Sequence, residues 1–472
     1  MGNAPFRIFT FSVLSYNARS MLLRGEAIVL VEELIARDIE RVEPPKPLRV
    51  MIVAENASFV QGGASFLAVQ WFRHLLREGV DVHLLVHIRS KAELDQSLST
   101  FTSRIHYVPE VFLQTICWKV GNAIFPPHVR DFTSGWVVHL ITQFMQRRLA
   151  RRLIPQYKID VIHEPTPVAP RLPSMIYGLG VPVVMGPMNG NMTYPPAYRS
   201  RQSLRERAFV PVARAFAGLA NRLIPGKRRA DILLVANERT RLALPSGYKG
   251  KVVVLCENGV DPDVWRRPDD LPARHGDQLR IAFLGRLVGW KGVDLALDVF
   301  AKVKTEMPSA ELWIMGDGPA LPRLRIQAKA LGLADAVTFH GWVSPEDCPR
   351  LLSQTDVLLY PSVFDCGGAV VLEAMALGLT VVALNWGGPG DYLAEGGGVL
   401  VNPVGRRQAV TELTNAVLNL TPSRRRKLGA AAQRRIADQY TWPAKVRRII
   451  GVYQSVCKYP EAATSKEVPW RR

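Results

Sequence analysis

The stretch Arg280-Ile281-Ala282-Phe283-Leu284-Gly285-Arg286-Leu287-Val288-Gly289-Trp290-Lys291-Gly292 joins a short apolar run to a glycine-rich loop with two cations. Such a run, ended by glycine, is typical of a buried strand. In open parallel sheets, ligands bind beyond the carboxyl ends of the strands. Arg286 and Lys291 therefore form a candidate clamp for a diphosphate, with a guanidinium fork and an ammonium point charge. Two loop cations that are simply solvated are the alternative.

The same alternation of apolar runs and helical stretches continues beyond this loop. The apolar runs that we expect to form strands are Arg280–Leu284, Glu311–Met315, Ala336–Phe339, Val357–Tyr360 and Thr380–Ala383. Helical stretches are expected between them at 293–305, 320–331, 347–353 and 369–377. Strands that alternate with helices predict a parallel sheet with covering helices.

A similar series precedes it in the chain. Expected strands are Val50–Ala54, Val82–Val86, Val161-Ile162 and Val181–Met185, with helical stretches at 65–77 and 173–179. A turn-rich connection over 258–278 separates the two series. We therefore expect an α/β protein with two doubly wound domains. The expected parts are an N-terminal extension (1–47), a first domain (48–264), a linker (265–278), a second domain (279–441), a helix packing back on the first domain (442–458) and a tail (459–472).

Two further strand ends in the second series carry candidate ligand groups. Gly316 and Asp317 form a turn directly after Glu311–Met315. After Val357–Tyr360, Gly367-Gly368 mark a helix N-terminus, where free backbone N–H groups favour a phosphate. Asp365 precedes this helix and Glu373 lies about two turns inside it, so their carboxylates can accept hydrogen bonds from sugar hydroxyls. Asp365 as a simple helix cap is the alternative.

In this order and at these intervals, the motifs resemble those of the retaining glycosyltransferases of family four. The segments that carry the resemblance are Gly285–Gly292, Gly316–Pro319, the acid-x7-acid pair Asp365 and Glu373, Glu257–Asp261, His163–Pro167 and Tyr440–Trp442. Together they extend over roughly residues 48–456. The resemblance implies the GT-B fold, in which two Rossmann-like domains face each other across a cleft.

The resemblance also implies a role for each matching residue. Arg286 and Lys291 would hold the donor diphosphate and stabilise charge on the leaving nucleotide. Glu373 would bind the ribose, and Asp365 would contact hydroxyls of the donor sugar. His163 would face the transferred sugar, with a buried structural histidine as the alternative. The remaining residues expected at the donor are Gly62, Gly63, Gly285, Gly316, Asp317, Gly341, Val343, Gly367 and Gly368.

One residue departs from the family pattern. The family usually has Glu where this chain has Asp365, which is one methylene shorter, so the contact with the donor sugar must shift or pass through water. An altered donor preference or a loss of activity would follow. The resemblance implies no cofactor and no metal. The Asp-x-Asp sequence Asp261-Pro262-Asp263 lies in the connection between the domains and is better interpreted as a turn than as a metal site.

The chain has 60 Lys and Arg against 41 Asp and Glu, a net charge of +19. Two windows, 145–158 and 199–229, hold most of the excess. On a helical wheel, one arc of the second window is apolar and the opposite arc is cationic, with Pro211 in the first turn. A solvated surface helix is one interpretation, and contact with anionic lipid or a diphosphate-bearing acceptor is the other. The windows show no nucleic-acid module, so no nucleic-acid partner is expected.

The composition indicates the class of protein and its cellular compartment. Hydrophobic residues make up 48% and charged residues 21%, which excludes wholesale disorder. There is no run of 18 apolar residues, and five scattered cysteines suit a reducing compartment. We therefore expect a cytoplasmic protein, peripheral on the inner face of the membrane.

The sequence thus predicts a retaining glycosyltransferase. It would move a hexose from a nucleotide diphosphate sugar to a lipid-linked or saccharide acceptor, expected to be acidic, in polysaccharide or glycolipid synthesis. A catalytically silent nucleotide-sugar binding or scaffold protein is the alternative from a different class. Fold alone also leaves open an epimerase.

Overall fold

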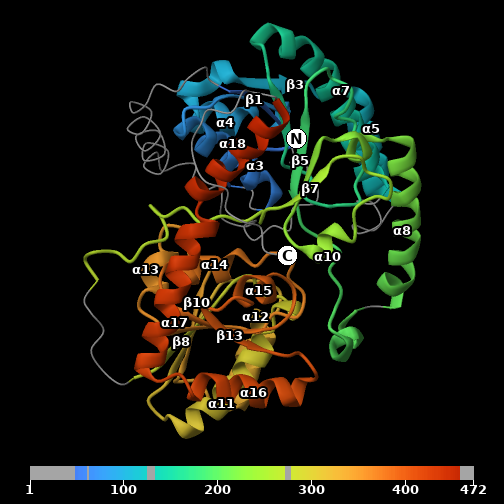
Figure 1. Ribbon diagram of the computed structural model, residues 1–472. Coiled ribbons are helices and arrows are strands. Elements are labelled where there is room, and N and C mark those ends of the chain that lie inside the picture. Colours follow the sequence, from blue (N-terminus) through green and yellow to red (C-terminus); the bar gives the residue numbers. More distant parts are fainter. Residues whose placement is uncertain (1–47, 61–62, 125–132, 203, 272–277, 458–472) are drawn as a thin grey trace.

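The computed structural model describes residues 48–60, 63–124, 133–202, 204–271 and 278–457, and this part of the chain forms two lobes around separate parallel sheets (Figure 1). The expected extension over 1–47, the tail over 459–472 and Gly62 lie outside the described residues.

The first sheet has the strand order β3-β2-β1-β4-β5-β6-β7 and is parallel throughout. Its strands are β1 (Arg49–Val53), β2 (Asp81–His87), β3 (Ile105–Val108), β4 (Val161–Glu164), β5 (Val183–Met188), β6 (Ile232–Val235) and β7 (Lys251–Val254). Its helices are α3 (Ala64–Arg77), α4 (Lys91–Ser97), α5 (Phe112–Ile124), α7 (Ser134–Tyr157), α8 (Leu204–Leu223), α9 (Gly226–Arg229) and α10 (Glu238–Arg241).

The second sheet has the order β10-β9-β8-β11-β12-β13 and is also parallel. Its strands are β8 (Arg280–Leu284), β9 (Glu311–Met315), β10 (Val337–Gly341), β11 (Val357–Tyr360), β12 (Thr380–Leu384) and β13 (Gly398–Val401). Its helices are α11 (Val293–Glu306), α12 (Leu321–Ala330), α13 (Cys348–Leu352), α14 (Ala369–Ala376), α15 (Gly387–Leu393), α16 (Arg406–Leu418) and α17 (Pro422–Arg435). Buried strands with apolar side chains on both faces are typical of sheets covered by helices on both sides.

The chain returns to the first domain after α17. At the crossing point, the Val260 N–H donates to the Tyr440 carbonyl (2.8 Å) and the Trp442 N–H donates to the Val260 carbonyl (2.9 Å). Helix α18 (Trp442–Cys457) follows and packs against α3, where the Trp442 and Trp71 rings meet edge to face at 5.1 Å. The apolar side of α18 is thereby buried in the core of the first domain.

A second crossing lies between β5 and α8, and we call residues 190–202 the strap. Tyr198 is 4% exposed and belongs to the core of the second domain, although β5 and α8 belong to the first. Tyr194 stacks on Phe364 with the ring centroids 4.6 Å apart. Arg201 forms an ion pair with Asp294 at 2.9 Å. The strap therefore attaches the first domain to the loops at the edge of the second sheet.

Two local expectations from the sequence are wrong. Residues 173–179 are not a helix; Ser174 instead forms an isolated bridge with Pro225. Its hydroxyl donates to the buried Glu164 carboxylate at 2.7 Å, which stabilises an irregular backbone that short-range periodicity cannot predict. Helix α8 begins at Leu204, so Pro211 lies inside the helix rather than in its first turn.

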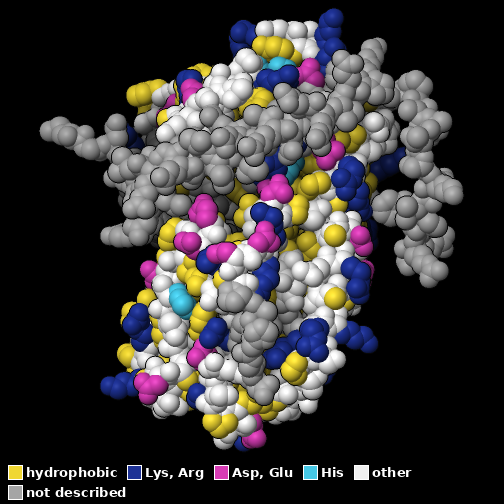
Figure 2. Space-filling view, turned by 90° about the vertical axis from the view of Figure 1, so that its left-hand side faces the viewer, with side chains coloured by type: hydrophobic (Ala, Val, Ile, Leu, Met, Phe, Trp, Pro, Cys, Tyr) yellow, Lys and Arg dark blue, Asp and Glu magenta, His cyan; other side chains and the backbone are white. Residues whose placement is uncertain are grey.

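One face of the second domain carries charges of both signs (Figure 2). On the visible part of the face in Figure 2, Lys and Arg side chains lie interspersed with Asp and Glu side chains over the second domain. Helix α8, with its Arg214 and Arg222, lies at the opposite edge of the molecule in Figure 1. Helix α8, which holds part of the second cationic window, therefore lies on a different side from the face in Figure 2.

Candidate active site

The loop after β8 places Lys291 at the edge of the second sheet. Its ammonium group donates to the Tyr360 hydroxyl at 2.5 Å and forms an ion pair with Asp365. The Tyr360 hydroxyl donates to the same Asp365 carboxylate at 2.6 Å. The three side chains meet because β8 and β11 are adjacent parallel strands, with Ile281 opposite Val357, so that both end at the same edge.

Tyr360 was not predicted as a site residue. Burial and the neighbouring Asp365 charge raise its pKa well above the ordinary value, so the hydroxyl keeps its proton and remains a hydrogen-bond donor. The available signal was one aromatic residue at the end of an otherwise aliphatic strand, directly before the loop that carries Asp365. Its partner Lys291 lies 69 residues away, which only the sheet topology reveals.

Glu373 lies in the second turn of α14, behind the loop that holds Asp365. Burial raises the pKa of its carboxyl group to about 7, and the positive charge of Lys291 opposes this rise. The carboxyl group is therefore close to the midpoint of its titration at neutral pH. A partner that donates hydrogen bonds to the carboxylate, such as a pair of hydroxyl groups, would stabilise the ionised form.

Three expected glycines lie together at the strand ends. The Gly316 N–H donates to the Gly341 carbonyl at 2.6 Å, and the Gly285 N–H donates to the Met315 carbonyl at 3.0 Å. A Cβ atom on Gly316 would lie 2.0 Å from the Gly285 carbonyl oxygen, so no larger residue fits there. Close packing of backbone in this way leaves room for a ligand beside the edge of the sheet.

The other expected donor residues lie in less specific settings. Asp317 is exposed, and its carboxylate accepts a hydrogen bond from the Gly318 N–H at 2.6 Å, as in a turn. Val343 is half-buried against the core of the second domain. Arg286 is half-buried on the same loop as Lys291. Gly63 precedes α3 in the first domain with a φ of 73°.

Gly367 and Gly368 lie at the N-terminus of α14, next to the first domain. A Cβ atom on Gly367 would lie 2.4 Å from Asn258 Nδ2 and 2.7 Å from Glu257 Oε1. The Asn189 amide donates to the Cys366 carbonyl at 2.9 Å. The expected acid-x7-acid loop and the segment that ends the first domain are therefore in direct contact.

The role expected for His163 is wrong. The side chain is fully buried at the end of β4, and burial lowers its pKa to about 4, so the ring is neutral. Nε2 lies 2.6 Å from the Gly186 carbonyl oxygen and Nδ1 lies 2.7 Å from the Tyr453 hydroxyl. Helix α18 covers the ring, and both nitrogens have partners inside the protein. His163 therefore does not face a sugar in the cleft.

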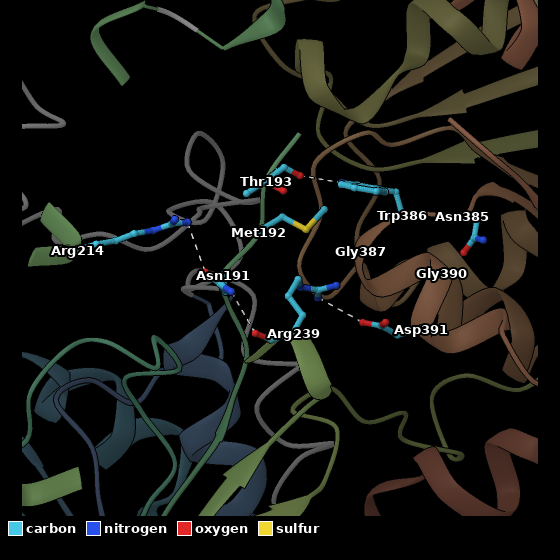
Figure 3. Close-up of a pocket in the computed structure, with 10 residues that line it drawn as sticks. All are labelled: Asn191, Met192, Thr193, Arg214, Arg239, Asn385, Trp386, Gly387, Gly390 and Asp391. Carbon is cyan, nitrogen blue, oxygen red and sulfur yellow. Dashed lines mark hydrogen bonds and ion pairs between the residues drawn. The ribbon is translucent and has the colours of Figure 1, made fainter. Parts of the chain in front are cut away.

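A pocket of about 470 Å³ lies between the two domains (Figure 3). The Trp386 indole N–H donates to the Thr193 carbonyl across it at 2.7 Å, and Arg239 pairs with Asp391 at 3.3 Å. The residues that line the pocket are Asn191, Met192, Thr193, Arg214, Arg239, Asn385, Trp386, Gly387, Gly390 and Asp391.

The described residues contain no group of three or more His, Cys, Asp or Glu side chains that could hold a metal ion. Asp261 of the Asp-x-Asp sequence pairs with Arg73 and also accepts a hydrogen bond from the Asp263 N–H at 3.1 Å. This carboxylate therefore stabilises the connection between the domains.

Solved structures with the same architecture define the class of fold. The glycosyltransferase of Rickettsia africae ESF-5 superposes with a TM-score of 0.60 over 88% of this chain and 100% of that chain, at 16% identity. Anabaena HepE, solved in complex with UDP, superposes with a TM-score of 0.57 over 86% of this chain and 100% of that chain, at 15% identity. The fold is therefore GT-B, as expected.

Sequence comparison relates the second domain to a known family. Residues 270–435 match the family described as Glycosyl transferases group 1. The alpha-D-kanosaminyltransferase of Streptomyces kanamyceticus is 27% identical over 287 residues, which are 59% of this chain and 72% of that protein.

A second relative is a mannosyltransferase. The GDP-mannose-dependent alpha-(1-6)-phosphatidylinositol monomannoside mannosyltransferase of Mycobacterium tuberculosis (strain CDC 1551 / Oshkosh) is 31% identical over 254 residues, which are 50% of this chain and 63% of that protein. The chain thus spans less than two thirds of the length of this relative.

Proposed function

We propose that the protein is a retaining glycosyltransferase that moves a hexose from a nucleotide diphosphate sugar to a lipid-linked or saccharide acceptor, in polysaccharide or glycolipid synthesis. The observation that carries the proposal is the cluster of Lys291, Tyr360 and Asp365 in front of Glu373, within the domain that matches the family. Lys291 is a cation that can bind phosphate, and Asp365 and Glu373 are acids that can accept hydrogen bonds from hydroxyl groups. The three residues lie at the carboxyl edge of a parallel sheet, where ligands bind in such folds.

Each group has a distinct task in this proposal. Lys291 and Arg286 bind the diphosphate and stabilise the negative charge that grows on it as the sugar leaves. Tyr360 positions the Lys291 ammonium and the Asp365 carboxylate through its two hydrogen bonds. Asp365 contacts hydroxyls of the donor sugar, and Glu373 accepts hydrogen bonds from the ribose.

The proposed reaction exchanges one bond for another at the anomeric carbon. The bond from this carbon to the phosphate oxygen breaks, and its electron pair stays on the leaving nucleoside diphosphate. The acceptor hydroxyl oxygen forms the new bond on the same face of the sugar, and its proton passes to the leaving phosphate oxygen. This course retains the anomeric configuration and needs neither a covalent enzyme intermediate nor a metal.

Variants of the second domain test this proposal. Products from a panel of nucleotide sugars and acceptors are measured by mass spectrometry, and the anomeric configuration is measured by NMR. Lys291→Gln and Glu373→Gln should each lower transfer at least about 100-fold, because each removes a group that touches the donor. Lys302→Gln is the control, since this exposed lysine lies on α11. Full activity in both site variants would refute the assignment, and an inverted product would refute the retaining course.

The ion pair between Lys291 and Asp365 favours a second candidate function, a silent nucleotide-sugar binding or scaffold protein. Asp365 neutralises the cation that is proposed to bind the diphosphate. In an active enzyme, the donor phosphate must compete with this carboxylate for Lys291. Binding of a nucleotide sugar without transfer or hydrolysis, across the whole panel, would favour the silent protein.

We also propose that the protein works in the cytoplasm and binds reversibly to an anionic membrane face through 145–158 and 199–229. No helix in the described part of the chain is long and apolar enough to cross a membrane. Not every cation of the windows is available, because Arg147 donates to the Tyr177 carbonyl, Arg201 pairs with Asp294 and Lys227 is buried. Flotation with anionic vesicles at low and high salt tests this proposal, and we expect salt to weaken the binding. If the protein does not bind the vesicles at low salt, the proposal is refuted.

A further inference from the structure

The interdomain pocket borders the proposed donor-sugar site. The Gly388 N–H donates to the Asp365 carbonyl at 2.9 Å, and a Cβ atom on the lining residue Gly387 would lie 2.2 Å from the same oxygen. Met192 of the strap closes the pocket from the other side, with its Cε 2.6 Å from that Cβ position. A molecule in this pocket would therefore lie next to the sugar that Asp365 contacts.

The pocket has cations of its own, separate from Lys291 and Arg286. Arg214 of α8 reaches into it, and its Nη2 lies 3.4 Å from Asn191 Oδ1, a neutral acceptor (Figure 3). Arg239 also lines it and is held by Asp391. The lining residues thus carry two arginines against one aspartate, which leaves the pocket positive.

A third arginine interacts electrostatically with Arg214. Burial and the positive charge of Arg214 lower the pKa of Arg171. Within the described residues, the buried Nε of Arg171 has no hydrogen-bond partner. An anion bound to Arg214 would reduce this repulsion, because it compensates the positive charge of the guanidinium group.

We propose that this pocket binds a phosphate group of the acceptor, with Arg214 as its main ligand and Arg239 beside it. The inference rests on the proposed function, since it assigns the acceptor side of that reaction. A pocket of about 470 Å³ has room for a phosphorylated sugar next to the donor. Met192 and Trp386 supply apolar contact surface for the sugar ring.

Helix α8 connects this pocket to the outside of the protein. Arg214 points inward, whereas Val212, Phe216 and Leu223 on the opposite side of the helix are 65%, 57% and 74% exposed. An apolar outer face with nearby arginines is the kind of surface that binds anionic lipid. The phosphate can therefore belong either to a lipid head group presented at α8 or to a soluble phosphorylated sugar.

Phosphate binding by the full chain tests the site without any turnover. Inorganic phosphate is titrated into the Lys291→Gln protein, in which the proposed donor clamp is disabled, and binding is measured by calorimetry. Arg214→Gln in that background should weaken binding at least 10-fold, and Arg239→Gln should weaken it less. Arg222→Gln should leave binding within about twofold, because it removes an equal charge from an exposed position of the same helix.

Unchanged phosphate binding in both Arg214→Gln and Arg239→Gln, with thermal midpoints close to that of the parent protein, would overturn the proposal. Arg214→Lys keeps the charge and should recover part of the binding. Failure of transfer in Lys291→Gln concerns the donor site alone, so the two proposals fail independently.

Vesicles of phosphatidylcholine with 20% phosphatidic acid then identify the source of the phosphate. Flotation that Arg214→Gln weakens much more than Arg222→Gln does would support a lipid head group. If Arg214→Gln weakens the binding of inorganic phosphate but leaves flotation unchanged, the acceptor is a soluble phosphorylated molecule. If Arg214→Gln changes neither phosphate affinity nor flotation, the proposed site is wrong.

Discussion

Replacing Glu373 with Gln should stabilise the folded protein above pH 7 while it removes donor binding. The structure keeps a proton on this carboxyl up to about pH 7, whereas the unfolded chain releases it near the ordinary pKa of 4.5. Between these values the folded state binds more protons than the unfolded state, so the free energy of unfolding falls as the pH rises. This contribution is fully present below pH 4.5 and is lost above pH 7.

The size of the effect follows from the two pKa values. At 1.36 kcal/mol for each pH unit between them, wild-type protein loses about 3 kcal/mol from this group as the carboxyl ionises. Gln has nearly the same shape and carries no charge at any pH, so the Glu373→Gln variant avoids the loss. The two proteins should therefore differ little near pH 4.5 and by up to about 3 kcal/mol at pH 8, which is a large share of the stability of an ordinary domain.

Urea unfolding of both proteins at several pH values between 5 and 8 measures this difference. Glu306→Gln is the matched control, because this glutamate is exposed at the end of α11 and its replacement should change stability by less than about 0.5 kcal/mol at each pH. If Glu373→Gln is no more stable than wild type at pH 8, burial does not raise the pKa of Glu373 in the way the structure indicates. Donor binding should strengthen from pH 6 to pH 8 in wild type, since the ribose hydroxyls favour the ionised form.

Three other replacements have clear expected outcomes. His163→Ala should cost about 3 kcal/mol, because it opens a cavity and removes the partners of Tyr453 and Gly186, yet the folded fraction should keep its transfer rate; a rate loss above 100-fold in well-folded protein would restore a catalytic role. Lys445→Met should lower the thermal midpoint, because the ammonium donates to the Glu257 and Asn258 carbonyls at 2.8 and 2.7 Å; an unchanged midpoint would contradict this. Gly316→Ala should weaken nucleotide binding at least 10-fold in a titration, since its Cβ would clash with the Gly285 carbonyl, and wild-type affinity would disprove the close packing.

The cluster at the proposed donor site could be located from the sequence because its residues follow their strands directly. An apolar run ended by glycine locates the carboxyl edge of the sheet, so the positions of Lys291 and Asp365 follow from local pattern plus the rule for parallel sheets. The distance along the chain does not matter once both strands are known. Tyr360 was not predicted as a site residue, because its hydroxyl contacts Lys291 only when β8 and β11 lie side by side.

The first domain was harder to predict because long-range packing determines it. His163 follows a strand, as a site residue would, but Tyr453 from α18 covers it across 290 residues of chain. The irregular segment 173–179 depends on a buried hydrogen bond between Ser174 and Glu164. Hydrophobic periodicity carries no information about either contact, since both join polar atoms from distant elements.

The two proposed anion sites depend on the fold in different ways. Lys291, Tyr360, Asp365 and Glu373 of the proposed donor site all belong to the second domain. The pocket takes Arg214 and Arg239 from the first domain and Trp386 and Asp391 from the second, so it exists only when the domains are placed as they are here. Weakening the Trp386 contact to the strap should therefore raise the KM for the acceptor and leave nucleotide affinity unchanged. This separation would allow the acceptor to change while the donor chemistry stays the same.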